Sequence, residues 1–457
     1  MTPASPTDLL LADASARGIR YLHGLHARKV APTPAAVEAL RSFDTPLPEG
    51  AGDPAATLRL LDEAGSPATT AMAGARFFGF VIGGSLPVTL AANWLAGAWD
   101  QNAVLYRPAP GASYLEQVAL RWLLDLLQLP PESAGAFVTG ATVANLCALA
   151  AARHAVLRRA GWDVEAHGLF GAPPITVIVG EEIHPSVTKS LGILGLGRNR
   201  VVRVPVDGQG RMRSDRLPPI AGPTIICAQA GNVNTGAFDP LVEISRHARA
   251  GGAWLHVDGA FGLWAAAAPS RRPFAGGMAD ADSWATDAHK WLNVPYDCGL
   301  AFVRDHDALK AAMAITAEYL PTKSEFRNPS DYTPELSRRA RGIEVWAALH
   351  SLGRAGIAEL IERNCAQARR FAEQLSAAGF TILNDVVLNQ VLVSFGSAEK
   401  TERTIKGIQD DGTCWCGITV WQGVTAMRIS VSSWATTDAD VDRSVVAMIR
   451  IAAKTGW

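Results

Sequence analysis

The feature of this chain that most constrains its fold is a series of short apolar runs that alternate with polar or helical segments between Ala136 and Asp305. The first, "AFVTGATVANLCALAAA", contains a short apolar lead, a Thr-Gly turn and an Ala-rich helix. Six β-rich runs follow: "ITVIVG", "VVRVPV", "TIICAQAG", "AWLHVDGAFG", "DSWATDAHKW" and "CGLAFVRD". Strands that alternate with helices pair through crossover connections, so the series predicts a mostly parallel α/β sheet.

The regions on either side of this series have other patterns. The first 50 residues are rich in Pro around a helical "AAVEALRSF", and the next segment has helical spacing interrupted by Gly and Pro turns. Beyond Glu335, two amphipathic helices precede three alternating runs that are typical of antiparallel strands. We therefore predict an N-terminal arm and helical segment over 1–105, a large α/β domain over 106–335, and a small C-terminal α+β domain over 336–457.

Composition excludes several classes of function. The 457 residues are 48% hydrophobic and carry a formal net charge of -1, so the chain can bury a large core and has no overall field for nucleic acid or an acidic membrane. No run approaches the ~20 apolar residues of a membrane span, and the N-terminus does not resemble a signal peptide, so we expect a cytoplasmic protein. Six cysteines are too sparse for a disulfide framework. Cys414 and Cys416 have no neighbouring pair of ligands, and no metal is expected.

The residues that follow the predicted strands are the candidates for chemistry, because ligands of open α/β sheets bind beyond the carboxyl ends of the strands. In "TGATVAN", a turn opens a helix whose first N–H groups suit a phosphate, although any β-turn-α connection can look like this. Asp258 ends an apolar strand, where a carboxylate needs a partner or caps the next segment. Lys290 stands between a histidine and a tryptophan, either as a functional amine or as a lysine with a buried stem.

Pyridoxal phosphate uses such groups together: a lysine that forms a Schiff base, a carboxylate on the pyridine nitrogen, and a phosphate cradle. The motifs "EEIHPSVTKS", "LHVDGAFG" and "DAHKWLN" occur in this order, with 74 residues from His184 to Asp258 and 32 from Asp258 to Lys290. In order and spacing, they resemble the group II pyridoxal-phosphate-dependent amino acid decarboxylases of fold type I. The resemblance implies a large domain with a mostly parallel seven-stranded sheet, and it extends from about Ala75 to the C-terminus.

The resemblance also implies roles for individual residues. Lys290 matches the Schiff-base lysine, Asp258 the partner of the pyridinium, and His184 the ring that stacks on the cofactor. Further matching positions are Ala141, Thr142 and His289 near the phosphate, Asn232 at the strand end that hydrogen-bonds the cofactor, Phe80 in the substrate pocket, and Arg428 near the substrate carboxylate, where a structural ion pair is the alternative.

Tyr332 lies in a segment that resembles the mobile catalytic loop of the family, in which a tyrosine closes over the site, often from the neighbouring subunit. Its phenol would protonate Cα after CO2 leaves. This chain departs from the family at Asn232, where Thr is frequent, and at Asp287-Ala288, where many members have Asn-Pro. A second carboxylate beside a phosphate is unfavourable unless it points away or binds a donor.

The implied reaction is decarboxylation of an L-amino acid to its amine. Aromatic residues of the N-terminal region favour an aromatic or other apolar substrate, although core packing explains them equally well, and Arg76 is the candidate partner for an acidic side chain. The aromatic residues in question are Phe77, Phe78, Phe80, Trp94 and Trp99. A carbon–carbon lyase with the same cofactor is the alternative, and loss of Lys290 or Asp258 would have indicated a non-catalytic relative. The family further implies a homodimer with shared sites.

Overall fold

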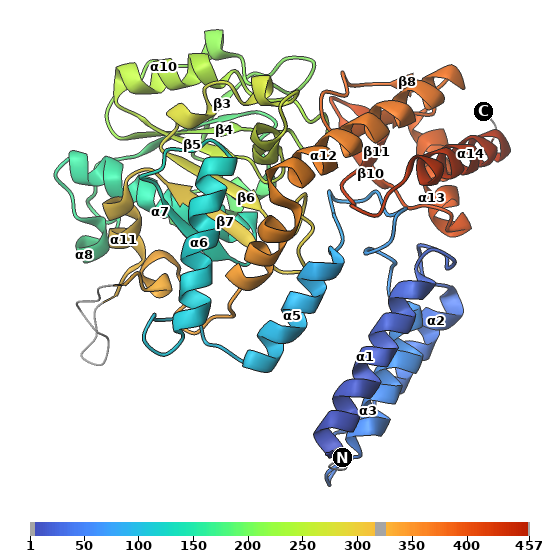
Figure 1. The fold of residues 1–457 in the computed structure, drawn as a ribbon. Helices are drawn as coiled ribbons and strands as arrows, with labels where there is room; N and C mark the ends of the chain where they lie inside the picture. Colours follow the sequence, from blue (N-terminus) through green and yellow to red (C-terminus); the bar gives the residue numbers. More distant parts are fainter. Residues whose placement is uncertain (1–4, 316–325, 456–457) are drawn as a thin grey trace.

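The computed structural model describes residues 5–315 and 326–455. Figure 1 shows a large α/β body, a smaller unit built on a second sheet, and a helical arm that extends from the main body. In the described part of the chain, no helix is both long and apolar enough to cross a membrane.

The large sheet has seven strands in the order β1-β7-β6-β5-β4-β2-β3. β7 is antiparallel to both of its neighbours, and the other pairs are parallel. The strands are β1 (Ala134–Val138), β2 (Thr176–Gly180), β3 (Val202–Val204), β4 (Thr224–Gln229), β5 (Trp254–Asp258), β6 (Ser283–Asp287) and β7 (Gly299–Val303). β2 to β7 each lie in one of the six β-rich runs, and β1 overlaps the apolar lead of the first run, so the predicted mostly parallel seven-stranded sheet is confirmed.

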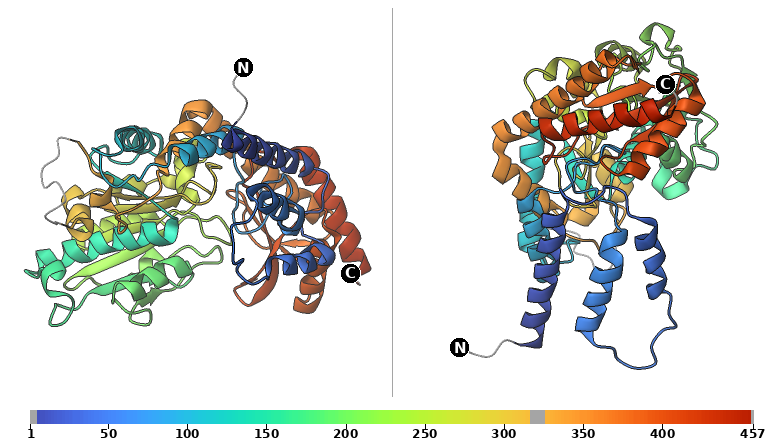
Figure 2. Two further views of the ribbon diagram at one scale, coloured as in Figure 1. Left: turned by 90° about the horizontal axis from the view of Figure 1, so that it is seen from below. Right: turned by 90° about the vertical axis from the view of Figure 1, so that its right-hand side faces the viewer.

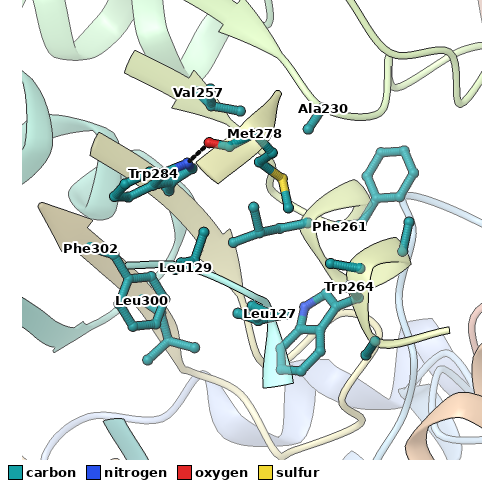
Figure 3. Close-up of a cluster of buried hydrophobic side chains, with 14 of the residues drawn as sticks. Leu127, Leu129, Ala230, Val257, Phe261, Trp264, Met278, Trp284, Leu300 and Phe302 are labelled. Carbon is teal, nitrogen blue, oxygen red and sulfur yellow. Dashed lines mark hydrogen bonds between the residues drawn. The ribbon is translucent and has the colours of Figure 1, made fainter. Parts of the chain in front are cut away.

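Both faces of this sheet are covered, so its strands are buried at nearly every position. Alternate residues such as Val179, Cys227 and Ala285 pack on one face against the Ala-rich helix α7 (Ala141–Arg159). On the other face, Val257 and Trp284 belong to the cluster drawn in Figure 3, where the indole of Trp284 donates to the backbone carbonyl of Met278. The helices around the sheet are α6 (Pro110–Leu126), α8 (Val164–His167), α9 (Pro185–Ile193), α10 (Leu241–Gly251) and α11 (His306–Met313).

The smaller unit has an antiparallel sheet in the order β10-β11-β9-β8. Its elements are α12 (Gly342–Ala377), β8 (Thr381–Ile382), β9 (Gln390–Ser394), α13 (Ala398–Asp411), β10 (Gly417–Trp421), β11 (Val424–Ser430) and α14 (Asp438–Lys454). The two predicted amphipathic helices are the two parts of α12, which breaks at Gly353, where φ is 59°. β8 is too short to show a periodic pattern. The domain boundaries at residues 105 and 335 stay predictions.

The arm contains more helix than its Pro-rich sequence indicated. α1 (Pro6–Gly24) starts at a capping box in which Ser5 and Asp8 satisfy each other's backbone N–H groups, with Pro6 in the first helical turn, where its missing N–H costs nothing. α2 (Pro34–Glu38) and α3 (Pro54–Leu60) complete the arm, and α5 (Pro87–Trp99) follows it. The right-hand view in Figure 2 shows the arm projecting from the main body. None of the residues of α1, α2 or α3 is buried.

A buried cluster of charges ties α6 to the segment that precedes α12. Glu116 accepts from Arg327 at 2.9 Å and from Arg338 at 3.0 Å, and the side chains of Glu116 and Arg338 are at most 1% exposed. Removing one partner of such a pair leaves a charge in a medium that does not solvate it. We expect Glu116→Gln to lower the free energy of unfolding by about 3–5 kcal/mol, measured by denaturant unfolding.

Glu359→Gln is the matched control, because it breaks an ion pair with Arg363 whose glutamate is 60% exposed. That change should cost less than about 0.5 kcal/mol. Equal effects of the two substitutions would contradict the structural role of Glu116.

Candidate active site

The carboxyl ends of β2, β4, β5 and β6 lie along one edge of the large sheet, since these strands are parallel. His184 follows β2, Asp258 ends β5 and Lys290 follows β6. Burial lowers the pKa of His184; the nearby charge of Asp258 opposes this shift, whereas those of Lys290 and Arg428 add to it. The charges of Asp258, Lys290 and Arg428 therefore all act on His184, and the lowered pKa leaves its ring neutral at pH 7.

Asp258 is 4% exposed and has three hydrogen-bond donors. The amide of Asn145 donates to Oδ2 at 3.1 Å, the hydroxyl of Ser186 at 3.3 Å, and the backbone N–H of Ala260 donates to Oδ1 at 3.2 Å. The same Ser186 hydroxyl lies 2.8 Å from Nδ1 of His184, which caps the N-terminus of α9. The carboxylate and the imidazole are thus oriented through a shared neighbour.

A chain of hydrogen bonds behind Asp258 fixes Asn145. The indole of Trp254 donates to Ser283 Oγ at 2.8 Å, and that hydroxyl lies 2.9 Å from Nδ1 of His256. Nε2 of His256 is 2.8 Å from Oδ1 of Asn145. Because the amide nitrogen of Asn145 donates to Asp258, its oxygen is the acceptor, and His256 carries its proton on Nε2.

The buried His256 in this series of hydrogen bonds makes the stability of the fold depend on pH. His256 is fully buried, and burial lowers its pKa to about 4. In the unfolded chain a histidine binds its proton at about pH 6.5, so stability is complete above that pH and is lost as the pH falls towards 4. We expect the free energy of unfolding of the natural chain to fall by about 2 kcal/mol more than that of His256→Gln between pH 7 and pH 4.5.

His23→Gln provides the control, since His23 is exposed on α1. Its pH dependence, followed by denaturant unfolding at each pH, should match that of the natural chain. If His256→Gln also matches the natural chain, His256 does not stay neutral in the fold.

Lys290 lies against a second carboxylate. Its Nζ is 2.9 Å from Oδ2 of Asp287, and the other oxygen of Asp287 accepts from the backbone N–H of Ala141 at 2.6 Å. Nε2 of His289 is 3.5 Å from the same Oδ1. Nδ1 of His289 accepts from the backbone N–H of Cys298, which assigns the ring proton to Nε2. Lys290, His289 and the first turn of α7 therefore meet around one anion.

The loop that carries Lys290 is fixed by Asn293, which is fully buried with φ of 57°. Its amide nitrogen donates to the carbonyl of Ser432, its amide oxygen accepts from the N–H of Trp434, and its backbone carbonyl accepts from the N–H of Leu86. Asn tolerates a left-handed conformation better than most residues. Three distant parts of the chain are thus joined three residues after Lys290.

The other predicted site residues are placed as follows. The carbonyl of Thr142 accepts from Ser190 in α9. Oδ1 of Asn232 accepts from the backbone of its own turn, at Asn234 and Thr235, while its buried Nδ2 has no hydrogen-bond partner in the described residues. Arg428, on β11, donates to the carbonyl of Val233 at 3.3 Å.

Of the aromatic residues predicted near the substrate, Phe80 is 59% exposed, and its ring stacks on that of Trp415 with centroids 5.5 Å apart. Phe77 and Phe78 are core residues. Arg76, the alternative partner for an acidic substrate, has a side chain that is 6% exposed and that already binds Asp440 and the carbonyls of His26 and Thr413.

The structure does not bring Tyr332 to Lys290 of the same chain. β7 is antiparallel to β6, so His306, which follows β7, lies at the edge of the sheet opposite to Lys290. The phenol of Tyr332 is 2.7 Å from Nε2 of His306, and the guanidinium of Arg327 lies 4.2 Å from its ring centroid. The side chain of Tyr332 is 5% exposed. The segment predicted as a mobile loop also includes residues 318–325, which lie outside the described residues.

Sequence reasoning missed Asn145, Ser186, His256 and Asn293. Asn145 is the polar residue in an otherwise Ala-rich turn of α7, and it is four residues after Ala141, hence on the same helix face. Its position on that face could have indicated that Asn145 belongs to the site. The contact of His256 with Asn145 joins β5 to α7 and has no local signature in the sequence.

The residues at this edge fit pyridoxal phosphate. Lys290 supplies an amine for its aldehyde, and Asp258 supplies a carboxylate that is already oriented by donors. The N-terminus of α7 accepts an anion, as the position of Asp287 shows directly. A Cβ on Gly140 would lie 3.4 Å from Oδ1 of Asp287, so glycine leaves the space beside this anion open. The fold and this set of residues define an α/β enzyme that acts through a lysine-bound pyridoxal cofactor.

Comparison with known proteins defines the family. The model of the pyridoxal-dependent decarboxylase conserved domain matches residues 66–396, which is more than half of the chain. The chain therefore belongs to the pyridoxal-dependent decarboxylase family, and its cofactor is pyridoxal phosphate.

Individual relatives differ in the amino acid that their names give. The acidic amino acid decarboxylase of Bos taurus is 30% identical over 322 residues, which are 67% of this chain and 61% of that protein. The aromatic-L-amino-acid decarboxylase of Bacillus atrophaeus is 29% identical over 72% of this chain and 68% of that protein. The crystal structure of Oryza sativa TDC with PLP and tryptamine has a TM-score of 0.91 at 22% identity and covers 99% of each chain, which confirms the fold.

Proposed function

We propose that this chain removes the α-carboxyl group of an L-amino acid as CO2 and leaves the amine. The observation that carries the proposal is the meeting of Lys290, Asp258 and His184 at the carboxyl edge of the sheet, in a chain of the pyridoxal-dependent decarboxylase family. A carbon–carbon lyase would use the same groups, and it would release no CO2.

Each of these residues has a distinct role in the proposal. When bound, pyridoxal phosphate supplies a ring that accepts the electron pair left behind by CO2. Lys290 would bind the aldehyde of the cofactor, and Asp258 would hold a proton on the ring nitrogen. His184, neutral at pH 7, would lie against the ring face.

The phosphate and the substrate would be bound by further residues of the site. Ala141, Thr142 and His289 would surround the phosphate, Asn232 would lie at the neighbouring strand end, and Arg428 would bind the substrate carboxylate. Arg428 suits this role because it is partly buried and acts electrostatically on His184.

We propose an aromatic or other apolar side chain for the substrate. Phe80 supports this, because it is exposed beside Trp415 and lies three residues before Gly83, where a Cβ would come within 2.0 Å of the carbonyl oxygen of Lys290. The segment with Phe80 thus packs directly on the loop of the catalytic lysine. The engagement of Arg76 in the core removes the predicted partner for an acidic side chain.

A panel of L-amino acids tests both parts of the proposal. We would measure CO2 release from tryptophan, tyrosine, phenylalanine, glutamate, aspartate and 2,4-diaminobutyrate with the cofactor present. The highest kcat/KM is expected for an aromatic substrate, and Phe80→Ala should lower it, whereas Phe170→Ala, at a residue 96% exposed, should not. A preference for glutamate or aspartate would overturn the substrate class, and CO2 from none of them would favour the lyase.

We also propose that the chain is a homodimer in which Tyr332 protonates Cα in the site of the second chain. An arm without buried residues supports association, because its exposed side chains include Leu9, Leu11 and Ile19. A role in a second chain fits the position of Tyr332 at the sheet edge opposite to its own Lys290.

Complementation between two variants tests this arrangement. Lys290→Ala and Tyr332→Phe chains should each be inactive alone as decarboxylases, and co-expression should restore activity, because one of the two sites then has both residues. Full activity of Tyr332→Phe alone would remove Tyr332 from the reaction, and inactive mixtures would place both residues in one site.

A further inference from the structure

A carboxylate of the chain itself lies where the proposed site would take up the cofactor phosphate. Asp287 is the last residue of β6, three residues before Lys290, and its side chain is 3% exposed. Oδ1 accepts from the first N–H of α7, at Ala141, and Oδ2 is 2.9 Å from Nζ of Lys290. The two oxygens of Asp287 therefore bind the N–H of Ala141 and the amine of Lys290, which are the groups that the proposed site offers to the cofactor.

The position favours an anion for two independent reasons. α7 has 19 residues, and its N-cap residue is Gly140, which has no side chain to accept from the first N–H groups of the helix. The N-terminus of α7 therefore carries partial positive charge. The ammonium group of Lys290 and the Nε2–H of His289 face the same point. Asp287 is the carboxylate that balances these charges.

A dianionic phosphate and a carboxylate compete for such a place. Like charges brought together in a buried site repel strongly, and an amine that donates to a carboxylate is not free to attack an aldehyde. A phosphate at the N-terminus of α7 would have to share or replace the contact that Asp287 makes with Ala141. An asparagine at this position would keep the shape and an acceptor oxygen without the charge.

We propose that Asp287 is a built-in counter-ion that occupies the phosphate position of the cofactor-free chain, pairs with Lys290 there, and is displaced when the cofactor binds. This inference rests on the proposed cofactor site. It assigns Asp287 as a positioning residue that stabilises the empty site and lowers the affinity for the phosphate-bearing cofactor.

The test compares Asp287→Asn with the natural chain in binding pyridoxal phosphate and pyridoxal, which lacks the phosphate. Dissociation constants would be measured from the absorbance band of the lysine-bound cofactor, without any substrate. The ratio of the pyridoxal constant to the pyridoxal phosphate constant should rise by about tenfold or more in Asp287→Asn, since only the phosphate meets the removed charge. The cofactor-free variant should also melt at a lower temperature, because Ala141 and Lys290 lose their anion.

Asp297→Asn is the matched control, because it removes one carboxylate from the loop that follows β6, where Asp297 pairs with Arg341 and is 41% exposed. It should leave the ratio unchanged. The counter-ion role is overturned if the ratio stays constant or falls in Asp287→Asn, or if it rises equally in Asp297→Asn. In either case, an absorbance band of the lysine-bound cofactor would still support the proposed cofactor site. If neither the natural chain nor the variant forms the band, the cofactor site itself is wrong and the inference fails with it.

Discussion

Lys290→Ala is expected to abolish the absorbance band of the bound cofactor and to lower kcat by at least about 10⁴-fold, as removal of a covalent catalytic residue does in other enzymes. The reason is structural as well as chemical. Nζ of Lys290 lies 2.9 Å from Oδ2 of Asp287, and its charge acts on His184. The measurement combines the spectrum with the rate of CO2 release.

Borohydride reduction gives an independent reading of the same prediction. It should fix the cofactor mass on the peptide that contains Lys290 in the natural chain and on no peptide of the variant. Lys189→Ala is the control, because Lys189 is exposed on α9 beside the predicted site; its kcat should stay within about twofold. A band that persists in Lys290→Ala would show that another lysine holds the cofactor.

Asp258→Asn is expected to retain the cofactor and to lose about 10²–10³-fold in kcat. In the proposed site, the charge of Asp258, and not only its hydrogen bond, would keep the ring nitrogen protonated. An asparagine accepts through one atom only, so it also loses one or more of the bonds from Asn145, Ser186 and Ala260. Rates must therefore be compared at a temperature at which both proteins are folded.

Asp239→Asn separates the chemical effect from the structural one. Asp239 is 5% exposed, its two oxygens accept from the N–H groups of Met212 and Gln229, and burial raises its pKa to about 6. Its substitution should lower the melting temperature without changing kcat. If Asp258→Asn behaves in the same way, Asp258 supports the fold and has no part in the reaction.

The large sheet could be predicted because its strands are signalled locally, as apolar runs that end in small or polar residues. Lys290, Asp258 and His184 follow from the same signal, since parallel strands bring their ends to one edge. Their meeting in the structure depends on the strand order, which places β5 between β4 and β6.

Other features depend on contacts that leave no local trace in the sequence. The polar chain from Trp254 to Asp258 is made by residues of β5, β6 and α7, and nothing in the sequence around His256 indicates its partners. The surroundings of Tyr332 are a second case. Pro329 opens a 3₁₀-helix and Arg327 covers the Tyr332 ring, and neither contact is indicated by the resemblance of this segment to a mobile loop.

The position of Asn293 has a consequence for the order in which the protein is completed during synthesis. The peptide groups that hold its side chain belong to Ser432 and Trp434, close to the end of the chain. A ribosome that has just made Lys290 must add more than a hundred further residues before these partners exist. The amine of Lys290 therefore reaches its final setting only after residues 432–434 have been made, and capture of a cofactor there would report that these residues have packed onto the loop after β6.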